Sequence, residues 1–238
     1  MNSMKGTIRL VYEDALWFLG KFLFLYITIP LMLGWILIEL IFGLPDDAVV
    51  AISVPAYLFI SMFAVMGFRS LISVAVAFGG TRIQLLKVFY GMGLATVSMS
   101  MLLLNILQYI LIATTVNNRF NIMHPATFML DEYHFITYLW IDLMIAFFLF
   151  GISFLIYCIS YRLGMKWSLV IVTLLILSGM FLYYGGVIDI STFEWIWNNS
   201  LEPLTYITLV GLIGLIGLFV TYPLMRNAPL NKSIFNVI

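Results

Sequence analysis

Residues 137–160 read TYLWIDLMIAFFLFGISFLIYCIS, and Asp142 is the sole charged residue in this run. A helix needs about 20 apolar residues to cross the roughly 30 Å hydrocarbon core of a bilayer, so the run is long enough to span a membrane. Because lipid offers the backbone no hydrogen-bond partner, a lipid-exposed span of this kind must be a helix rather than an open sheet. The run therefore predicts a transmembrane helix.

Five further apolar runs have a similar length. Together the six predicted spans are 22–42, 49–68, 91–113, 137–160, 168–186 and 204–224, and within them only Glu39 and Asp142 are charged. With 63% hydrophobic and 9% charged residues among 238, the composition excludes an ordinary soluble domain. We predict an all-α membrane protein, with residues 1–238 forming a single transmembrane domain.

The basic residues predict the orientation of these spans. Of the 11 Lys and Arg residues, Arg119 alone falls in the gaps on one side of the membrane. The other ten lie in the alternate gaps and are Lys5, Arg9, Lys21, Arg69, Arg82, Lys87, Arg162, Lys166, Arg226 and Lys232. Short loops rich in Lys and Arg stay in the cytoplasm, so we expect both termini there. We expect a multi-pass protein of a bacterial plasma membrane that does not bind nucleic acid, since topology explains its scattered basic residues.

The N-terminal segment 1–21 has a helical pattern of its own. Its apolar residues recur at helical spacing and are Ile8, Val11, Tyr12, Ala15, Leu16 and Leu19. This pattern favours an amphipathic helix that lies on the inner membrane surface before the first span begins. The alternative is a frayed terminus whose charges only set the topology.

The longest internal connection, 69–90, predicts a helical elbow. We expect the second helix to continue to about residue 78 and to break at Gly79-Gly80, because paired glycines punctuate helices. A short amphipathic helix over 81–90 then follows, with its apolar side toward the bundle or membrane. Its water-facing positions are Arg82, Gln84 and Lys87. Such a helix can press into a soluble partner, or it can be a surface helix that only anchors the topology.

Polar residues within the spans are candidate pathway residues, since burying them in lipid is costly. They are Glu39 in the first span, Ser98, Asn105 and Gln108 along one side of the third, and Asp142 and Ser153 along one side of the fourth. These residues can line a polar pathway or a seam between helices. The alternative is that both carboxylates reach the outer interface, since each is close to a span end.

The sequence gives no sign of an enzyme. Four potential ligands in the external segment 114–136 could bind zinc, namely His124, Asp131, Glu132 and His134. They have no recognised zinc-ligand spacing, so we interpret them instead as solvated loop residues. The second external segment, 187–203, carries Trp195 and Trp197 and is expected to form short helices at the outer headgroups or an ordinary aromatic belt. Cys158 is the only cysteine, which excludes an internal disulfide. We assign no catalytic residue, metal or cofactor to this chain.

The run Ala77-Phe78-Gly79-Gly80-Thr81-Arg82, followed by Phe89-Tyr90-Gly91, resembles small bacterial ABC-2-type permeases. The local motif covers about 15 residues, whereas the six-span topology with an amphipathic N-terminus covers the whole chain. The resemblance implies a permease subunit that dimerises and binds two cytoplasmic ATPase subunits, which bind ATP and Mg. It assigns to the coupling helix Gly79, Gly80, Thr81, Arg82, Gln84, Lys87 and Tyr90.

The same resemblance makes segment 1–21 the connecting helix beside the coupling helix. Among relatives, exporters of amphipathic peptides such as phenol-soluble modulins are closest in size, so we expect amphipathic or lipophilic cargo to move outward. Three other classes stay open. They are an ion-coupled secondary transporter, a non-transporting immunity or assembly factor, and a membrane enzyme, which the missing motifs disfavour.

Overall fold

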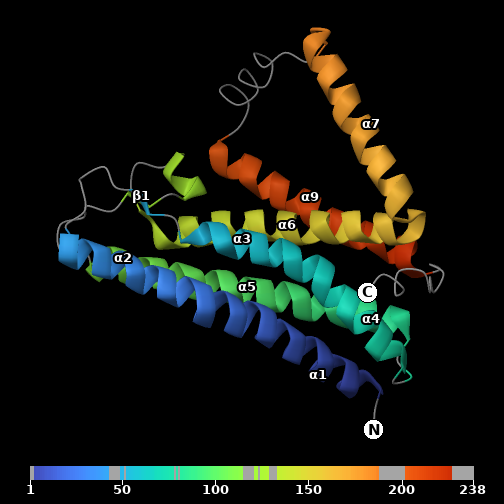
Figure 1. Ribbon diagram of the computed structural model, residues 1–238, viewed down its shortest axis with the longest axis horizontal. Coiled ribbons are helices and arrows are strands. Elements are labelled where there is room, and N and C mark those ends of the chain that lie inside the picture. The colour runs from blue at the N-terminus through green and yellow to red at the C-terminus, as the bar shows by residue number, and fades with distance from the viewer. Residues whose placement is uncertain are drawn as a thin grey trace.

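The computed structural model describes residues 3–42, 49–50, 52–77, 79, 81–114, 121–122, 124–128, 133–187 and 202–226. Nearly all of these residues are helical (Figure 1). The α-helices are α1 (Ser3–Ala15), α2 (Ile29–Phe42), α3 (Ser53–Met62), α4 (Phe68–Ala77), α5 (Arg82–Thr114), α6 (Phe135–Leu163), α7 (Met165–Tyr184) and α9 (Pro203–Arg226). Two π-helical segments, η1 (Leu16–Thr28) and η2 (Phe63–Gly67), and a 3-10 turn, η3 (Pro125–Phe128), complete the helical elements.

The described strands are only two residues long. β1 (Val49–Val50) pairs in parallel with β2 (Asn121–Ile122), so the pair ties two connections together at one end of the bundle without forming a sheet layer. Within the described ranges, six helical segments are long and apolar enough to cross a membrane, namely Met4–Phe42, Ser53–Ile72, Arg82–Ala113, Phe135–Leu163, Lys166–Tyr184 and Pro203–Arg226. The prediction of a helical protein with six apolar spans is therefore confirmed.

The first span differs from the prediction. α1, η1 and α2 form one unbroken helix from residue 3 to residue 42, so the predicted separate surface helix over 1–21 and its boundary at residue 22 are wrong. The physical reason is a continuous buried stripe made of Val11, Ala15, Leu19 and Leu23. Residues four apart advance by slightly more than one turn of an α-helix, so such a stripe drifts around the helix. The wider i→i+5 turns of η1 counter this drift and help keep the stripe against the bundle.

The elbow between the second and third spans agrees with the prediction in part. Helix continues through α3, η2 and α4 to Ala77, and Gly79 follows with a φ of 76°, a left-handed conformation that favours glycine. Phe78 and Gly80 lie outside the described residues. The predicted short helix over 81–90 is not separate, because α5 runs without a break from Arg82 to Thr114. We use the name elbow for residues 79–90.

A cluster of phenylalanines forms the core beside the elbow. Phe68 of α4 lies 4.9 Å from Phe154 of α6 and 5.1 Å from Phe89 of α5, measured between ring centroids. Phe63 and Phe150 stack on the same cluster, and all five side chains are fully buried. We call these five residues the aromatic core. It packs the first turns of α5 against neighbouring helices, which explains why the elbow does not form a detached surface helix.

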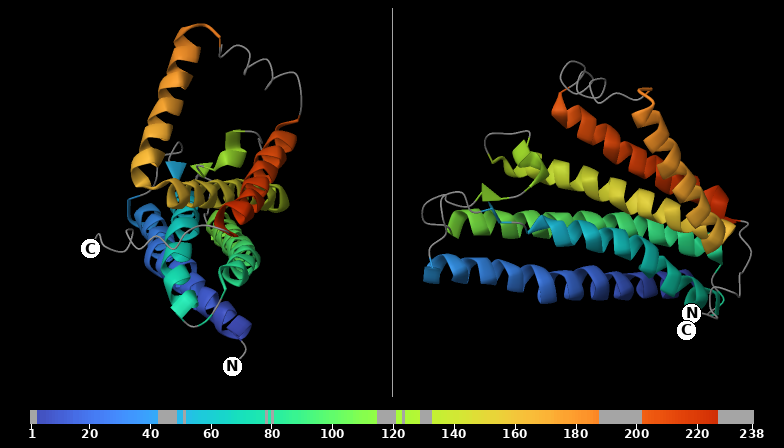
Figure 2. Two further views of the ribbon diagram at one scale, coloured as in Figure 1. Left: turned by 90° about the vertical axis from the view of Figure 1, so that its right-hand side faces the viewer. Right: turned by 45° about the horizontal axis from the view of Figure 1, so that its top comes forward.

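The closest helix pair is α6 with α9. Glycines at Gly211, Gly214 and Gly217 face α6, and a Cβ atom added to Gly214 would come within 2.6 Å of the Phe147 carbonyl oxygen. Small residues at a helix interface permit this close approach of the two backbones. Beyond them, α7 stands away from the bundle (Figures 1 and 2), and every residue from Leu169 to Val187 is exposed.

Candidate functional site

The side chain of Asp142 lies inside the helix bundle. It is 0% exposed and sits on α6 about 10 Å along the axis from the first residue of that helix, Phe135. Asn105 of α5 donates from Nδ2 to Asp142 Oδ2 at 2.6 Å. The hydroxyl of Tyr57 on α3 donates to Asp142 Oδ1, as does His124, whose Nε2 lies 2.8 Å away. We call these four residues the polar centre.

His124 is held in one tautomer by its second ring nitrogen. The backbone N–H of Ala126 donates to His124 Nδ1 at 3.0 Å, so Nδ1 carries no proton. Nε2 therefore carries the ring proton and donates it to Asp142, and the imidazole is neutral. The ring also stacks on Tyr138, with centroids 4.6 Å apart. Thr127 donates from both its N–H and its hydroxyl to the His124 carbonyl, which folds segment 124–127 around the ring.

The interpretation of His124 as a solvated loop residue is wrong, because its side chain is 1% exposed. Asp142, for which the outer interface was the alternative, is fully buried within the bundle. The physical reason is that His124 and Ala126 lie buried against α6, where His124 supplies a donor to the carboxylate. Three hydrogen bonds replace those that the Asp142 carboxylate would make with water. An isolated transmembrane helix could not supply these donors.

Several polar atoms near the polar centre have no hydrogen-bond partner within the part of the chain that the structure describes. They are Asn105 Oδ1, both side-chain polar atoms of Gln108, Ser53 Oγ and the Tyr133 hydroxyl, and all are buried. Gln108 lies one turn beyond Asn105 on α5, and Ser53 lies one turn before Tyr57 on α3. Buried polar groups of this kind are usually satisfied by water or an ion.

Tyr133 extends this set toward the beginning of α6. Its ring centroid lies 4.5 Å from that of Tyr138, which in turn stacks on His124. Burial, followed by the neighbouring Tyr138 and Asp142, raises the pKa of Tyr133 to about 12. The Tyr133 hydroxyl therefore keeps its proton at neutral pH and can donate a hydrogen bond.

The structure brings together only some of the predicted pathway residues. Asn105 and Asp142 are bonded, and Gln108 lies on the same face of α5 as Asn105. Ser98 donates instead to the Leu94 carbonyl of its own helix at 2.8 Å. Glu39 and Ser153 are partly exposed, and neither bonds to Asp142. The sequence reasoning missed Tyr57 and His124, and the only available signal was the pair Ser53 and Tyr57, one turn apart in an apolar span.

A zinc site, which was the disfavoured alternative for His124, has no structural support. Both ring nitrogens of His124 face protein partners, so none is left for a metal. His134 is exposed, whereas Asp131 and Glu132 lie outside the described residues. Elsewhere in the described ranges, no group of three or more His, Cys, Asp or Glu side chains is placed to hold a metal ion.

The elbow residues have distinct positions. Thr81 caps α5, since its Oγ1 accepts a hydrogen bond from the Gln84 N–H at 3.2 Å. Arg82 and Gln84 are partly exposed and Lys87 is exposed, as the predicted water-facing side requires. Tyr90 points into the bundle, where its hydroxyl forms a hydrogen bond with the hydroxyl of Thr221 on α9.

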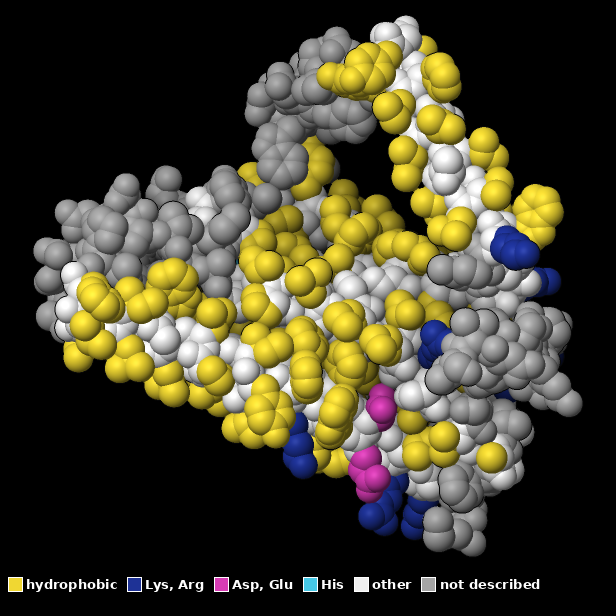
Figure 3. Space-filling model, viewed as in Figure 1, with side chains coloured by type: hydrophobic (Ala, Val, Ile, Leu, Met, Phe, Trp, Pro, Cys, Tyr) yellow, Lys and Arg dark blue, Asp and Glu magenta, His cyan; other side chains and the backbone are white. Residues whose placement is uncertain are grey.

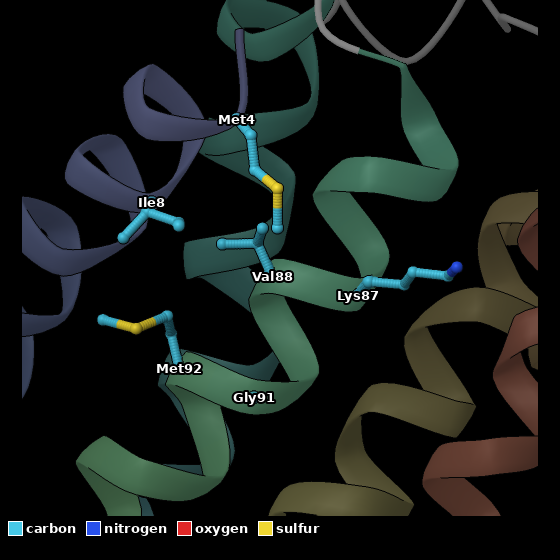
Figure 4. A pocket seen from close by; sticks show the side chains of 6 residues that line it. All are labelled: Met4, Ile8, Lys87, Val88, Gly91 and Met92. Carbon is cyan, nitrogen blue, oxygen red and sulfur yellow. The ribbon is translucent and has the colours of Figure 1, made fainter. Parts of the chain in front are cut away.

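A small groove lies between α1 and the elbow. It has a volume of about 220 Å³ and is lined by Met4, Ile8, Lys87, Val88, Gly91 and Met92. Figure 4 shows the apolar side chains gathered between the two helices, while the Lys87 side chain points away from them. The groove is therefore apolar, and the Lys87 ammonium is directed away from its interior.

Comparisons with known proteins give no match. No family model matches the chain, and neither a curated protein nor a solved structure matches it. The polar centre and the elbow are therefore the features on which a function must be argued.

Proposed function

We propose that this chain is the permease subunit of an ATP-driven exporter in a bacterial plasma membrane. One observation carries the proposal: α5 is a single helix from the exposed elbow to Asn105 of the polar centre. The 24 residues from Arg82 to Asn105 correspond to about 35 Å of helix. A displacement applied to the elbow by a soluble partner is therefore transmitted along α5 to the hydrogen bonds of Asp142.

Tyr90 supports the same mechanism. Its hydrogen bond to Thr221 links the elbow to α9, and α9 packs closely on α6 through glycines. A movement of the elbow thus acts on two helices besides α5. ATP and Mg bind to separate ATPase subunits, and this chain contributes no cofactor and no catalytic residue.

The distribution of charge supports a cytoplasmic elbow. In Figure 3, Lys and Arg side chains gather at the end of the bundle that carries the N-terminus and the elbow. Described residues at this end include Lys5, Arg82, Lys87, Arg162 and Arg226. The positive-inside rule places such an end in the cytoplasm. Both termini then face the cell interior, and the beginnings of α3 and α6 face outward.

The exposed surfaces favour a second permease subunit. α7 is apolar and exposed along almost its whole length, so lipid or another copy must cover it. Two copies would enclose a cavity between them, where amphipathic peptides or lipophilic cargo move outward. The partners are thus a second permease subunit, cytoplasmic ATPase subunits and membrane lipids.

The proposal is tested at the elbow by reversing two charges. The chain is co-expressed with an ABC ATPase, which the proposal requires to be encoded beside it, and the double variant Arg82→Glu/Lys87→Glu is purified. We expect loss of co-purification, and loss of the ATP hydrolysis that an amphipathic helical peptide stimulates in the wild-type complex. The matched control is Lys166→Glu/Arg226→Glu, which reverses two exposed charges at the same end of the bundle but outside the elbow. Wild-type assembly and hydrolysis in the elbow variant would remove the proposed coupling role.

A second candidate is an ion-coupled transporter, which the complete burial of the Asp142 carboxylate favours. It predicts cargo uptake into vesicles that contain this chain alone, driven by a proton or sodium gradient. The Asp142→Asn variant then abolishes uptake. Uptake that requires the ATPase and ignores the gradient excludes this candidate.

A further inference from the structure

We propose that the polar centre is a proton-binding site that exchanges protons with one end of the bundle only, and that proton uptake opens the turn of segment 124–127 around the His124 ring. That end is the one at which α3 and α6 begin, which is the outer end in the proposed orientation. The inference needs no ATPase and no cargo. It rests on the proposed function only for identifying that end as the outer one.

The hydrogen bonds of His124 identify the atom that takes the proton. A proton from water that binds His124 Nδ1 gives an imidazolium, which still donates from Nε2 to Asp142 Oδ1. The new N–H at Nδ1 then faces the N–H of Ala126, and two donors cannot bond to each other. The Ala126 amide loses its acceptor, so segment 124–127 loses the contact that closes its turn on the ring.

The charge balance of the site favours this uptake. Asp142 accepts from Tyr57, Asn105 and His124, which are all neutral donors, and no Lys or Arg in the described ranges pairs with it. An imidazolium at His124 would neutralise the buried carboxylate. The other titratable groups around the ring, among described residues, are Tyr138, stacked on it, and Tyr133 beyond Tyr138. Both are phenols that stay neutral over the pH range in which His titrates.

Unpaired polar atoms give the site access to one end. Ser53 lies one turn from Tyr57 toward the beginning of α3, and Gln108 lies one turn from Asn105 toward the end of α5. Tyr133 precedes α6 at the same end. Water needs two to four polar partners to occupy a buried site, and these side chains supply them. They mark a hydrated connection between the polar centre and that end.

The opposite direction is closed by apolar side chains. One turn toward the elbow from the polar centre lie Ile60 of α3, Met101 of α5 and Ala146 of α6, all 0% exposed. The aromatic core follows, with Phe63 stacked on Phe150 at 6.2 Å between centroids. These side chains cannot hold water or relay a proton. The polar centre therefore senses acid from one side and does not conduct protons across the membrane, which separates this inference from ion-coupled transport.

The test measures how accessible Ala126 is at two pH values. Ala126 is 0% exposed, so an Ala126→Cys variant in a Cys158→Ala background is shielded while the segment is closed. A His134→Cys variant in the same background is the matched control, because His134 is exposed in the same connection and corrects for the pH dependence of thiol labelling. We expect the ratio of the two labelling rates to rise about fivefold or more between pH 7.5 and 5.5.

Two comparisons decide the outcome. In a His124→Gln variant, the side-chain amide can donate to Asp142 and accept from Ala126 but does not titrate in this range, so we expect a constant ratio. Acidifying only the elbow side of sealed vesicles should also leave the ratio constant. A ratio that ignores pH in the parent, or rises equally in His124→Gln, overturns the proton site. A rise caused by acid on the elbow side overturns the one-sided access.

A measurement on the unsubstituted protein covers the case in which the cysteine variants do not fold. Hydrogen exchange of the amides in 124–128, corrected for the intrinsic effect of pH, should increase on acidification. No corrected change would overturn the opening of this turn. Because none of these measurements involves ATP hydrolysis or cargo, a failure here is distinct from a failure of the exporter proposal.

Discussion

Asn105 and Asp142 are 37 residues apart in the chain and are joined by a hydrogen bond of 2.6 Å from Nδ2 to Oδ2. The same Nδ2 also donates to the Met101 carbonyl at 3.1 Å, so the orientation of the amide is fixed from two directions. This bond is the direct polar link between α5, which begins at the elbow, and the carboxylate of α6.

Replacing Asn105 by leucine should destabilise the protein. The Asn105→Leu variant keeps a similar shape but leaves Asp142 Oδ2 buried without its donor, which costs about 1–3 kcal/mol. We expect a lower thermal unfolding midpoint in detergent. Ser98→Ala is the control, because the Ser98 hydroxyl donates to the Leu94 carbonyl of its own helix, and it should stay within about 0.5 kcal/mol of wild type. Equal midpoints for the two variants would contradict the role given to this bond.

The sequence predicts the members of this pair but not their partnership. Asn105 and Asp142 stand out because polar residues are rare in apolar spans. Tyr57 does not stand out, since tyrosine is common in such spans near an interface. His124 lies in a connection without periodicity, so no pattern reports that the chain folds back over α6. Tertiary packing brings Tyr57 and His124 to Asp142, and no residue spacing in a single sequence predicts that packing.

Helix ends show the same limit. The apolar runs predict which residues suit lipid, and the six helical spans agree with them. They do not predict where a helix stops. The buried stripe that includes Val11 and Leu19 extends the first helix from residue 22 back toward the N-terminus. Buried Leu86 and Phe89 likewise join the elbow to the helix of the third span. Gly79, with its left-handed backbone, marks a break that could be predicted from residue type, and Gly164 and Gly186, with φ of 85° and 70°, lie in the same way at the two ends of α7.

Gly214 should tolerate no side chain. A Cβ on Gly214 overlaps the backbone of Phe147 and Phe148, and a backbone atom cannot move aside as a side chain can. We expect Gly214→Ala to separate α6 from α9 and to cost at least about 2 kcal/mol, seen as aggregation at a lower temperature by size-exclusion chromatography. On the same helix, Gly217→Ala meets nothing closer than 3.5 Å and should behave like wild type. Similar losses in both variants would indicate that α6 and α9 are not in direct backbone contact at Gly214.

Gly79 should resist substitution for a different reason. Nothing lies within 4 Å of an added Cβ, but its φ of 76° is unfavourable for alanine by roughly 1–2 kcal/mol. Gly79→Ala should therefore lower the unfolding midpoint through backbone strain at the elbow. Gly91→Ala also meets no atom within 4 Å and lies inside α5, where alanine favours helix by up to about 1 kcal/mol. We expect the two variants to shift the midpoint in opposite directions, and a gain in stability at Gly79 would exclude the strained turn.

The orientation of the bundle can be tested with two cysteines at its opposite ends. Gln84 is partly exposed in the first turn of α5, and His134 is exposed just before α6. The native Cys158 is fully buried and is replaced by alanine to remove background. If the basic end faces the cytoplasm, a membrane-impermeant thiol reagent added to intact cells labels the His134→Cys variant.

The Gln84→Cys variant should react only after the membrane is permeabilised. This contrast controls for expression and for the reagent, since each variant must become fully labelled in permeabilised cells. Labelling of Gln84→Cys in intact cells would put the elbow outside. A cytoplasmic ATPase could not reach the elbow there, and both the coupling role of Lys87 and the outward direction of the polar centre would have to be abandoned together.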